Sequence, residues 1–133
     1  MPTLHLRLIP TANNGIQKVF LSNEIRSQDL TLQSAVVSQK GSGYNQTSVY
    51  VRIPFLSSNQ FHSSDKKGFL TFPVGHSAGL DHFSFGSGLK LECDHIAEVF
   101  ECQLLDSNLA GLTDATHFTS VDLYFSYKSA GLF

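Results

Sequence analysis

An all-β sandwich or barrel is the fold class that this sequence predicts, and three observations lead to it. About nine segments alternate apolar with polar residues, which is the period of a strand with one buried face. Gly, Ser and Asn separate these segments, which follow one another at roughly 10 to 15 residues. No stretch has the apolar spacing of a convincing helix. The last segment, residues 120–128, is the clearest, since Val121, Leu123, Phe125 and Tyr127 share one predicted face.

Length and composition indicate one folded domain. The chain has 133 residues, of which 41% are hydrophobic and 15% are charged, and its formal net charge is −2. A chain of this size can bury a core without disulfides or metal, so we expect a single domain over residues 1–133. The largest basic cluster is the pair Lys66-Lys67, which is too small to predict nucleic acid as a partner. No apolar run is long enough to span a bilayer, and the N-terminus lacks the apolar stretch of a signal peptide, so we expect a protein that is not secreted.

Two short strands are predicted at the start of the chain. Residues 3–9 alternate through Leu4, Leu6 and Leu8, and residues 16–21 resume the pattern. Between them, Asn13-Asn14-Gly15 predicts a turn, because Asn and Gly tolerate the positive φ that tight turns demand.

Two further strands follow in the first half. Residues 30–38 form a longer strand whose alternation becomes ambiguous where Val36 and Val37 are adjacent. Residues 48–53 form a half-buried strand, and Pro54 ends it because proline cannot donate to a ladder.

The second half contributes five predicted strands. Pro73 lies within the first of them and indicates a sheet edge or a bulge. Gly86-Ser87-Gly88 predicts a tight turn between the second and the third. The five strands are residues 68–75, 81–86, 89–93, 99–106 and 120–128. The predicted core of the whole domain consists of Leu30, Leu32, Val49, Val51, Leu70, Phe72, Leu91, Phe100, Leu104, Val121, Leu123 and Phe125.

The sequence contains no recognisable catalytic or metal-binding constellation. In Cys93-Asp94-His95, adjacent side chains of a strand point to opposite faces, and the remaining histidines have no partner at an established ligand spacing. Gly86-Ser87-Gly88 lacks the pattern of a nucleophile elbow. Glu92, Glu98 and Glu101 could form a carboxylate pair, but the chain has no Trp, the side chain that most often lines sugar-binding clefts. We therefore expect no catalytic residues, no cofactor and no bound metal; the six histidines are His5, His62, His76, His82, His95 and His117.

The two cysteines, Cys93 and Cys102, lie on neighbouring predicted strands. In a reducing compartment we expect both to be buried thiols. A disulfide between them stays open as an alternative, because geometry decides it and sequence does not.

Several large apolar residues in polar segments are candidates for contacts between subunits. Such residues usually mark a surface that something covers. The alternative is that each folds back onto its own sandwich. The candidate interface residues are Phe55, Leu56, Phe61, Leu132 and Phe133.

Two pairs of segments resemble a known family of structural proteins. At the start of the chain these are residues 19–25 and 30–38, and at the end they are residues 100–106 and 121–127, joined by a short loop. These strand-and-turn patterns resemble the single jelly-roll penton and minor capsid proteins of tailless double-stranded DNA viruses, including virophages, polinton-like viruses and their giant-virus relatives. In that family a Gly commonly follows the Asp of the last loop at once, whereas here Gly111 comes later, after Asp106.

The resemblance implies a single jelly-roll β-sandwich of about eight strands, with residues 3–9 as an extra N-terminal strand. It also implies a structural protein of an icosahedral virion, a penton or minor capsid component that is not an enzyme. Its partners would be copies of itself, as a pentamer or alternatively a trimer, and a larger major capsid protein. Assembly would take place in the cytoplasm or nucleus of the host cell.

Two other classes of protein fit an all-β chain of this kind. A lectin-like or receptor-binding trimeric module would carry aromatic or acidic residues in the loops at one end, where Tyr44, Phe61 and His62 are the candidates. A small cupin-like enzyme would need histidines and a carboxylate that converge inside the barrel.

Overall fold

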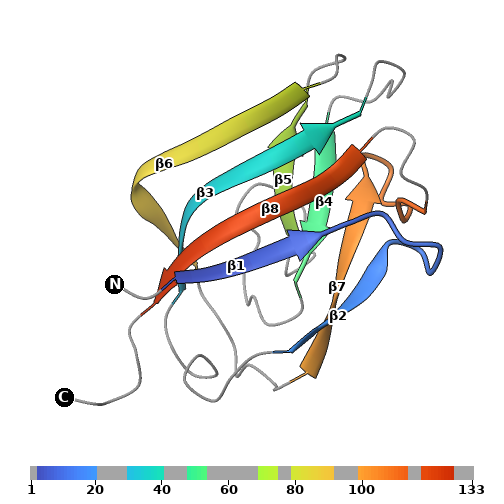
Figure 1. The fold of residues 1–133 in the computed structure, drawn as a ribbon, viewed down its shortest axis with the longest axis horizontal. Coiled ribbons are helices and arrows are strands. Elements are labelled where there is room, and N and C mark those ends of the chain that lie inside the picture. The colour runs from blue at the N-terminus through green and yellow to red at the C-terminus, as the bar shows by residue number, and fades with distance from the viewer. Residues whose placement is uncertain are drawn as a thin grey trace.

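The described part of the chain is an all-β protein. The computed structural model describes residues 3–20, 30–40, 48–53, 69–74, 79–91, 99–113 and 118–127. These residues form eight strands and no helix (Figure 1). The strands are β1 (Thr3–Leu8), β2 (Ile16–Phe20), β3 (Leu30–Gln39), β4 (Ser48–Arg52), β5 (Phe69–Pro73), β6 (Gly79–Leu91), β7 (Val99–Asp106) and β8 (Phe118–Tyr127).

The strands form two antiparallel four-stranded sheets that lie face to face. One sheet, sheet A, has the order β1-β8-β3-β6, and the other, sheet B, has the order β2-β7-β4-β5. Only β4 and β5 are consecutive strands that pair with each other; every other connection passes from one sheet to the other (Figure 1). This order is that of a jelly roll, as expected. The predicted N-terminal strand is present as β1, and it is the first of the eight strands rather than an addition to them.

The core lies between the two sheets. Every predicted core residue whose side chain the structure describes is buried; the Leu91 side chain lies outside that description. Burial of each large apolar side chain contributes roughly 1.5 to 3 kcal/mol, so this layer supplies the main driving force for folding. The core also contains residues outside that predicted set, namely Leu6, Leu8, Ala35, Val37, Ile53, Cys102 and Tyr127. The expectation that Cys102 is a buried thiol is confirmed.

A bulge in β3 explains the ambiguous alternation of this strand. Leu30 and Leu32 are buried at even positions, whereas Ala35 and Val37 are buried at odd positions. The pairing of β3 with β8 shifts by one residue between Leu32 and Ser34, so an extra residue enters the strand there. Such a bulge moves every later side chain to the opposite face.

The predicted turn at Gly86-Ser87-Gly88 is wrong, because these residues lie within the single strand β6. The pairing of β6 with β3 jumps from Leu32↔Leu89 to Ser34↔Ser84, so extra residues bulge out of β6 while β3 continues on both sides. Gly86 and Gly88 have φ values of 59° and 103° there. A Cβ atom on Gly88 would collide with the Thr31 side chain. The two glycines permit a bulge rather than a hairpin.

The predicted turn at Asn13-Asn14-Gly15 is confirmed, and it joins the two sheets. Asn14 and Gly15 have φ values of 55° and 73°, and the Ile16 amide donates to the Asn13 carbonyl oxygen at 2.9 Å. Gly111 lies so close to the Asn14 backbone that a Cβ atom would collide with it. The chain therefore turns at this corner from β1 in sheet A to β2 in sheet B.

Pro73 is the last residue of β5, which is an edge strand of sheet B. The prediction of an edge position is confirmed. At an edge, the missing amide hydrogen of proline costs no ladder hydrogen bond.

Candidate functional site

The predicted interface residues belong to segments outside the described part of the chain. Phe55, Leu56, Phe61, Leu132 and Phe133 all lie outside the described residues, so their role in assembly stays a prediction. Four of the histidines also lie outside the described residues, namely His62, His76, His95 and His117. Cys93, Glu92 and Glu98 lie outside them as well.

The described histidines lie on the outer face of sheet A rather than inside the sandwich. His5 is on β1 and His82 is on β6, and both are exposed. Within the described ranges, no three His, Cys, Asp or Glu side chains are grouped closely enough to hold a metal ion.

Cys102 has a free thiol on the inner side of β7. Its side chain is fully buried in the core. Burial raises the pKa of the Cys102 thiol to about 12, although the nearby Arg52 charge acts in the opposite direction. Because the thiolate is the nucleophilic form, we expect this cysteine to be unreactive in the folded protein.

The densest polar group of the described residues is centred on Asp122 and joins the edge strand β1 to its neighbour β8. We call His5, Arg7, Ser120, Asp122 and Tyr124 the Asp122 cluster. The β1–β8 register places His5 opposite Tyr124 and Arg7 opposite Asp122. All five side chains therefore lie on the outer face of sheet A.

The carboxylate of Asp122 accepts hydrogen bonds from three side chains. Arg7 Nε donates to Oδ1 at 2.8 Å, and Ser120 Oγ donates to Oδ2 at 2.9 Å. His5 Nε2 lies 2.7 Å from Oδ1, and since an ionised carboxylate only accepts, this nitrogen carries the donated hydrogen. The His5 ring also stacks on Tyr124, with centroids 4.5 Å apart. Only 5% of the Asp122 side chain is exposed.

Two opposing effects act on the ionisation of Asp122. Burial alone raises the pKa of its carboxyl group, because water no longer solvates the charge. The hydrogen bonds from Arg7, His5 and Ser120, together with the Arg7 charge, outweigh burial, and the pKa lies below its ordinary value. The same contact raises the pKa of Arg7. Asp122 is therefore an ionised and fully paired carboxylate at neutral pH.

The Asp122 cluster links two strands and does not have the geometry of a catalytic triad. A triad needs the histidine between the nucleophile and the carboxylate. Here Ser120 and His5 both bind the carboxylate, on different oxygens, so His5 does not activate the serine. The cluster links β1 to β8 through charge-assisted hydrogen bonds between their side chains.

The Asp122 cluster was not predicted from the sequence. His5 and Asp122 are 117 residues apart in the sequence. Alternation does put His5 and Arg7 on the polar side of the first strand, and Asp122 on the polar side of the last. The sequence alone does not indicate that these two strands are neighbours, or in which register they pair.

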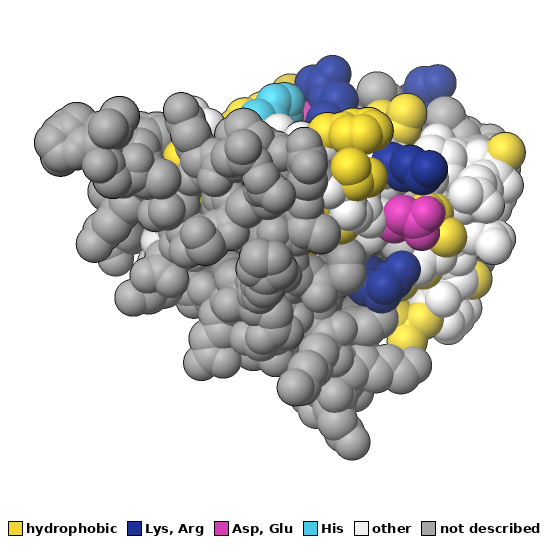
Figure 2. Space-filling view, turned by 90° about the horizontal axis from the view of Figure 1, so that it is seen from below, with side chains coloured by type: hydrophobic (Ala, Val, Ile, Leu, Met, Phe, Trp, Pro, Cys, Tyr) yellow, Lys and Arg dark blue, Asp and Glu magenta, His cyan; other side chains and the backbone are white. Residues whose placement is uncertain are grey.

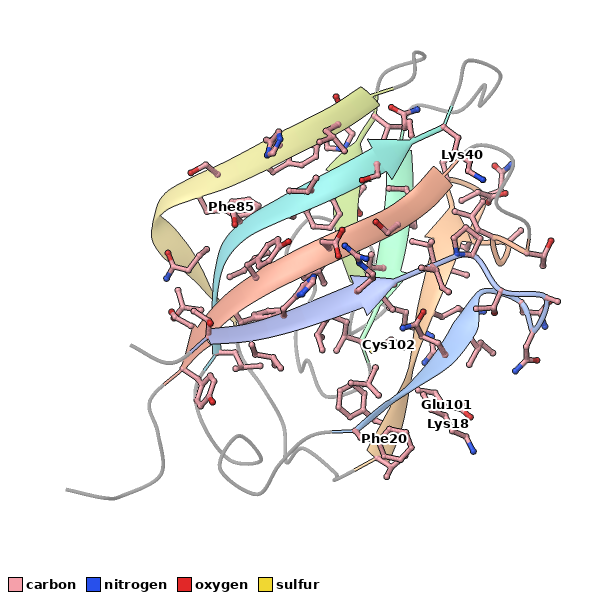
Figure 3. The ribbon with its side chains drawn as sticks, in the orientation of Figure 1. Lys18, Phe20, Lys40, Phe85, Glu101 and Cys102 are labelled. Atoms are coloured by element: carbon pink, nitrogen blue, oxygen red, sulfur yellow. The ribbon has the colours of Figure 1, made fainter. Side chains whose placement is uncertain are left out.

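A second surface feature is the outer face of the β2–β7 pair in sheet B, where apolar and charged side chains are both exposed. We call Lys18, Phe20, Val99 and Glu101 the β2–β7 face. Phe20 pairs with Val99 and Lys18 pairs with Glu101 across the two strands. Phe20 is 72% exposed and Val99 is 44% exposed. Figure 3 shows Lys18, Phe20 and Glu101 together at the lower part of β2 and β7, and Figure 2 shows apolar and charged side chains side by side on the described part of the molecule seen from below.

Comparisons with protein-family models, with curated proteins and with solved structures found no match to this chain. Among the described residues there is no helix that could cross a membrane.

Proposed function

We propose that this protein is a structural component of a viral capsid, a penton or minor capsid protein of the single jelly-roll kind. The observation that carries the proposal is the strand order, β1-β8-β3-β6 in one sheet and β2-β7-β4-β5 in the other. Eight strands in this order form the fold that capsid proteins share with lectin domains and cupins. The sequence resemblance of the first and last strands to capsid proteins favours the capsid role among these three.

The filled interior supports a role without catalysis. Most inner positions of the described strands carry aliphatic or aromatic side chains, which form one continuous core with Cys102. Gln39, at the end of β3, is a buried polar exception. A cupin-like enzyme would need histidine and carboxylate side chains that converge inside the barrel. In this protein the described histidines, His5 and His82, lie on the outside.

The exposed apolar side chains support a protein that binds other protein subunits. Phe20, Leu80, Ile9 and Val99 are large apolar residues that are 44% or more exposed. In a capsid, such side chains are covered by neighbouring subunits. The proposal includes homo-oligomers, with a pentamer favoured over a trimer, and a larger major capsid protein as partner in the virion.

The oligomeric state of the purified full chain tests the proposal. We expect a closed ring of five copies by native mass spectrometry, and ring-shaped particles by electron microscopy of the same sample. Deletion of residues 130–133 should abolish the ring while leaving the melting temperature unchanged, because Leu132 and Phe133 are predicted to contact a neighbouring subunit. A monomer that binds glycans on an array, or a melting temperature that falls strongly with a chelator, would contradict the capsid role.

A further inference from the structure

We infer that the β2–β7 face is a two-fold docking surface for a second copy of this chain. This contact goes beyond the proposed function, because a two-fold contact is distinct from the contacts that close a ring of five: within rings it would join subunits of two rings, and without rings it would give a dimer.

An exposed apolar pair lies on this face. Phe20 and Val99 are cross-strand partners, so their side chains form one continuous apolar spot. Exposed apolar residues are ordinary when they are single, but a paired and strongly exposed Phe on a sheet face indicates a contact surface. Aromatic residues are also enriched at the energetically dominant positions of protein interfaces.

The charges of this face are complementary to those of a second copy. Lys18 and Glu101 form the row of side chains next to Phe20 and Val99, and both are exposed. The ion pairs recorded among the described residues are those of Asp122, so neither Lys18 nor Glu101 is engaged in one there. Both charges are therefore available to a second molecule.

The geometry of the register specifies how two copies fit. Consider a two-fold axis that runs parallel to the strands, midway between β2 and β7, in the plane between two copies. This axis places each β2 side chain opposite the β7 side chain at the same level in the other copy. Lys18 then meets Glu101 of the second copy, and Phe20 meets Val99 of the second copy, and each contact occurs twice. Two sheets packed this way have nearly aligned strands, which is a common sheet-on-sheet arrangement.

The same register disfavours pairing through the outer edge of β2, the terminal strand of sheet B in the described residues. Lys18 is the central residue of β2, so an antiparallel edge pair centred on this strand would bring two Lys18 side chains opposite each other. Like charges in that position destabilise a ladder, and edge lysines are a known protection against strand addition. The second copy therefore binds to the face of the β2–β7 pair.

Charge reversal in the full chain tests the inference. Lys18→Glu alone would bring two carboxylates together at both symmetric contacts, and Glu101→Lys alone would bring two ammonium groups together there. We expect each variant to dissociate at least about tenfold more readily than the unchanged protein, since both symmetric contacts become repulsive. An equimolar mixture of the two variants should form a heterodimer that pairs the two carboxylates of one chain with the two ammonium groups of the other. Native mass spectrometry distinguishes the heterodimer if one variant is isotopically labelled.

The double variant Lys18→Glu with Glu101→Lys should dimerise like the unchanged protein, which separates loss of the contact from loss of folding. Lys40→Glu is the matched control, since Lys40 is exposed and lies at the opposite end of the molecule in Figure 3. That variant should leave association unchanged. Phe20→Ser should weaken the dimer without any change of charge.

Three results would overturn the inference. The first is an unchanged protein that stays monomeric on the order of 100 µM, a concentration at which a weak specific contact is populated. The second is a mixture of the two single variants that does not associate. The third is a closed ring that both single variants form as readily as the unchanged protein, which would support the proposed function while excluding the two-fold contact.

Discussion

The outer faces of the β1–β8 and β2–β7 pairs occupy equivalent places in the two sheets, yet they differ in how their side chains are satisfied. Each pair consists of an edge strand and its neighbour. On β1–β8, the charge of Asp122 is bound by Arg7 and His5 of the edge strand, and the carboxylate is nearly removed from water. On β2–β7, Lys18, Glu101 and Phe20 are all exposed.

The difference follows from the side chains that the register brings together. On the outer face of β1–β8, short polar side chains such as Ser120 and Asp122 form hydrogen bonds with each other within the chain. On the second face, a Lys and a Glu lie in one row and an exposed Phe lies in the next. Side chains that bind one another within the chain contribute to the stability of the fold, whereas exposed side chains are free to contribute to association. Substitutions that compare the two should therefore separate these effects.

The largest expected difference is between two phenylalanines. Phe125 is fully buried on β8, so Phe125→Ala should lower the free energy of unfolding by about 3 to 5 kcal/mol, through lost burial and an unfilled cavity. Phe20 is 72% exposed, so Phe20→Ala should change it by no more than about 0.5 kcal/mol. Urea unfolding followed by circular dichroism measures both. Similar losses in the two variants would mean that Phe20 is covered within its own chain.

The predictability of Phe125 illustrates how much of the fold the sequence contains. Alternation marks the buried side of β8, β4 and β7, because a strand packed on one face must place apolar residues at every second position. Bulges defeat the same rule. Ala35 and Val37 lie in the core only because the register of β3 shifts before them, and the glycines of β6 form a bulge where a turn was expected.

A smaller difference is expected between two carboxylates. Asp122→Asn keeps the size of the side chain but removes the charge that Arg7 and His5 bind. Because Arg7 is largely exposed, we expect a loss of about 1 to 2 kcal/mol in unfolding free energy. Glu101→Gln, the matched change on the β2–β7 face, should cost no more than about 0.5 kcal/mol. Equal effects on unfolding would show that the Asp122 cluster does not stabilise the fold.

The candidate sites were less predictable than the core for a physical reason. Both depend on which strands are neighbours, and strand order is decided by the packing of the whole sandwich rather than by any local pattern. Lys18 and Glu101 are ordinary polar residues in the sequence, and only the β2–β7 register puts them in one row. The predicted interface residues were instead chosen as apolar residues in polar segments, and they lie outside the described residues.

The pH dependence of stability should also distinguish the two faces. The folded state lowers the pKa of Asp122. Its contribution to the free energy of unfolding is therefore complete above the ordinary carboxyl pKa of about 4, and this contribution is lost as the pH falls below that value. Arg7 and His5 are the ionisable side chains that contact Asp122 in the cluster. Between about pH 5 and pH 3, the unchanged protein should lose more stability than Asp122→Asn. Parallel pH profiles of the two proteins would argue against this assignment.

The smallest expected effect is the absence of a reaction at Cys102, which lies on the inner side of β7, beneath the β2–β7 face. The outer side chains of β7 near this residue are exposed, but its thiol points into the core and has a pKa raised to about 12 by burial. Iodoacetamide at about pH 8 should therefore leave Cys102 unmodified in the folded protein and alkylate it after denaturation. Peptide mapping by mass spectrometry reads out this cysteine separately from Cys93. Rapid modification of Cys102 in the folded state would mean that β7 opens locally, and that the β2–β7 pair is a mobile edge rather than the rigid surface on which a second copy could dock.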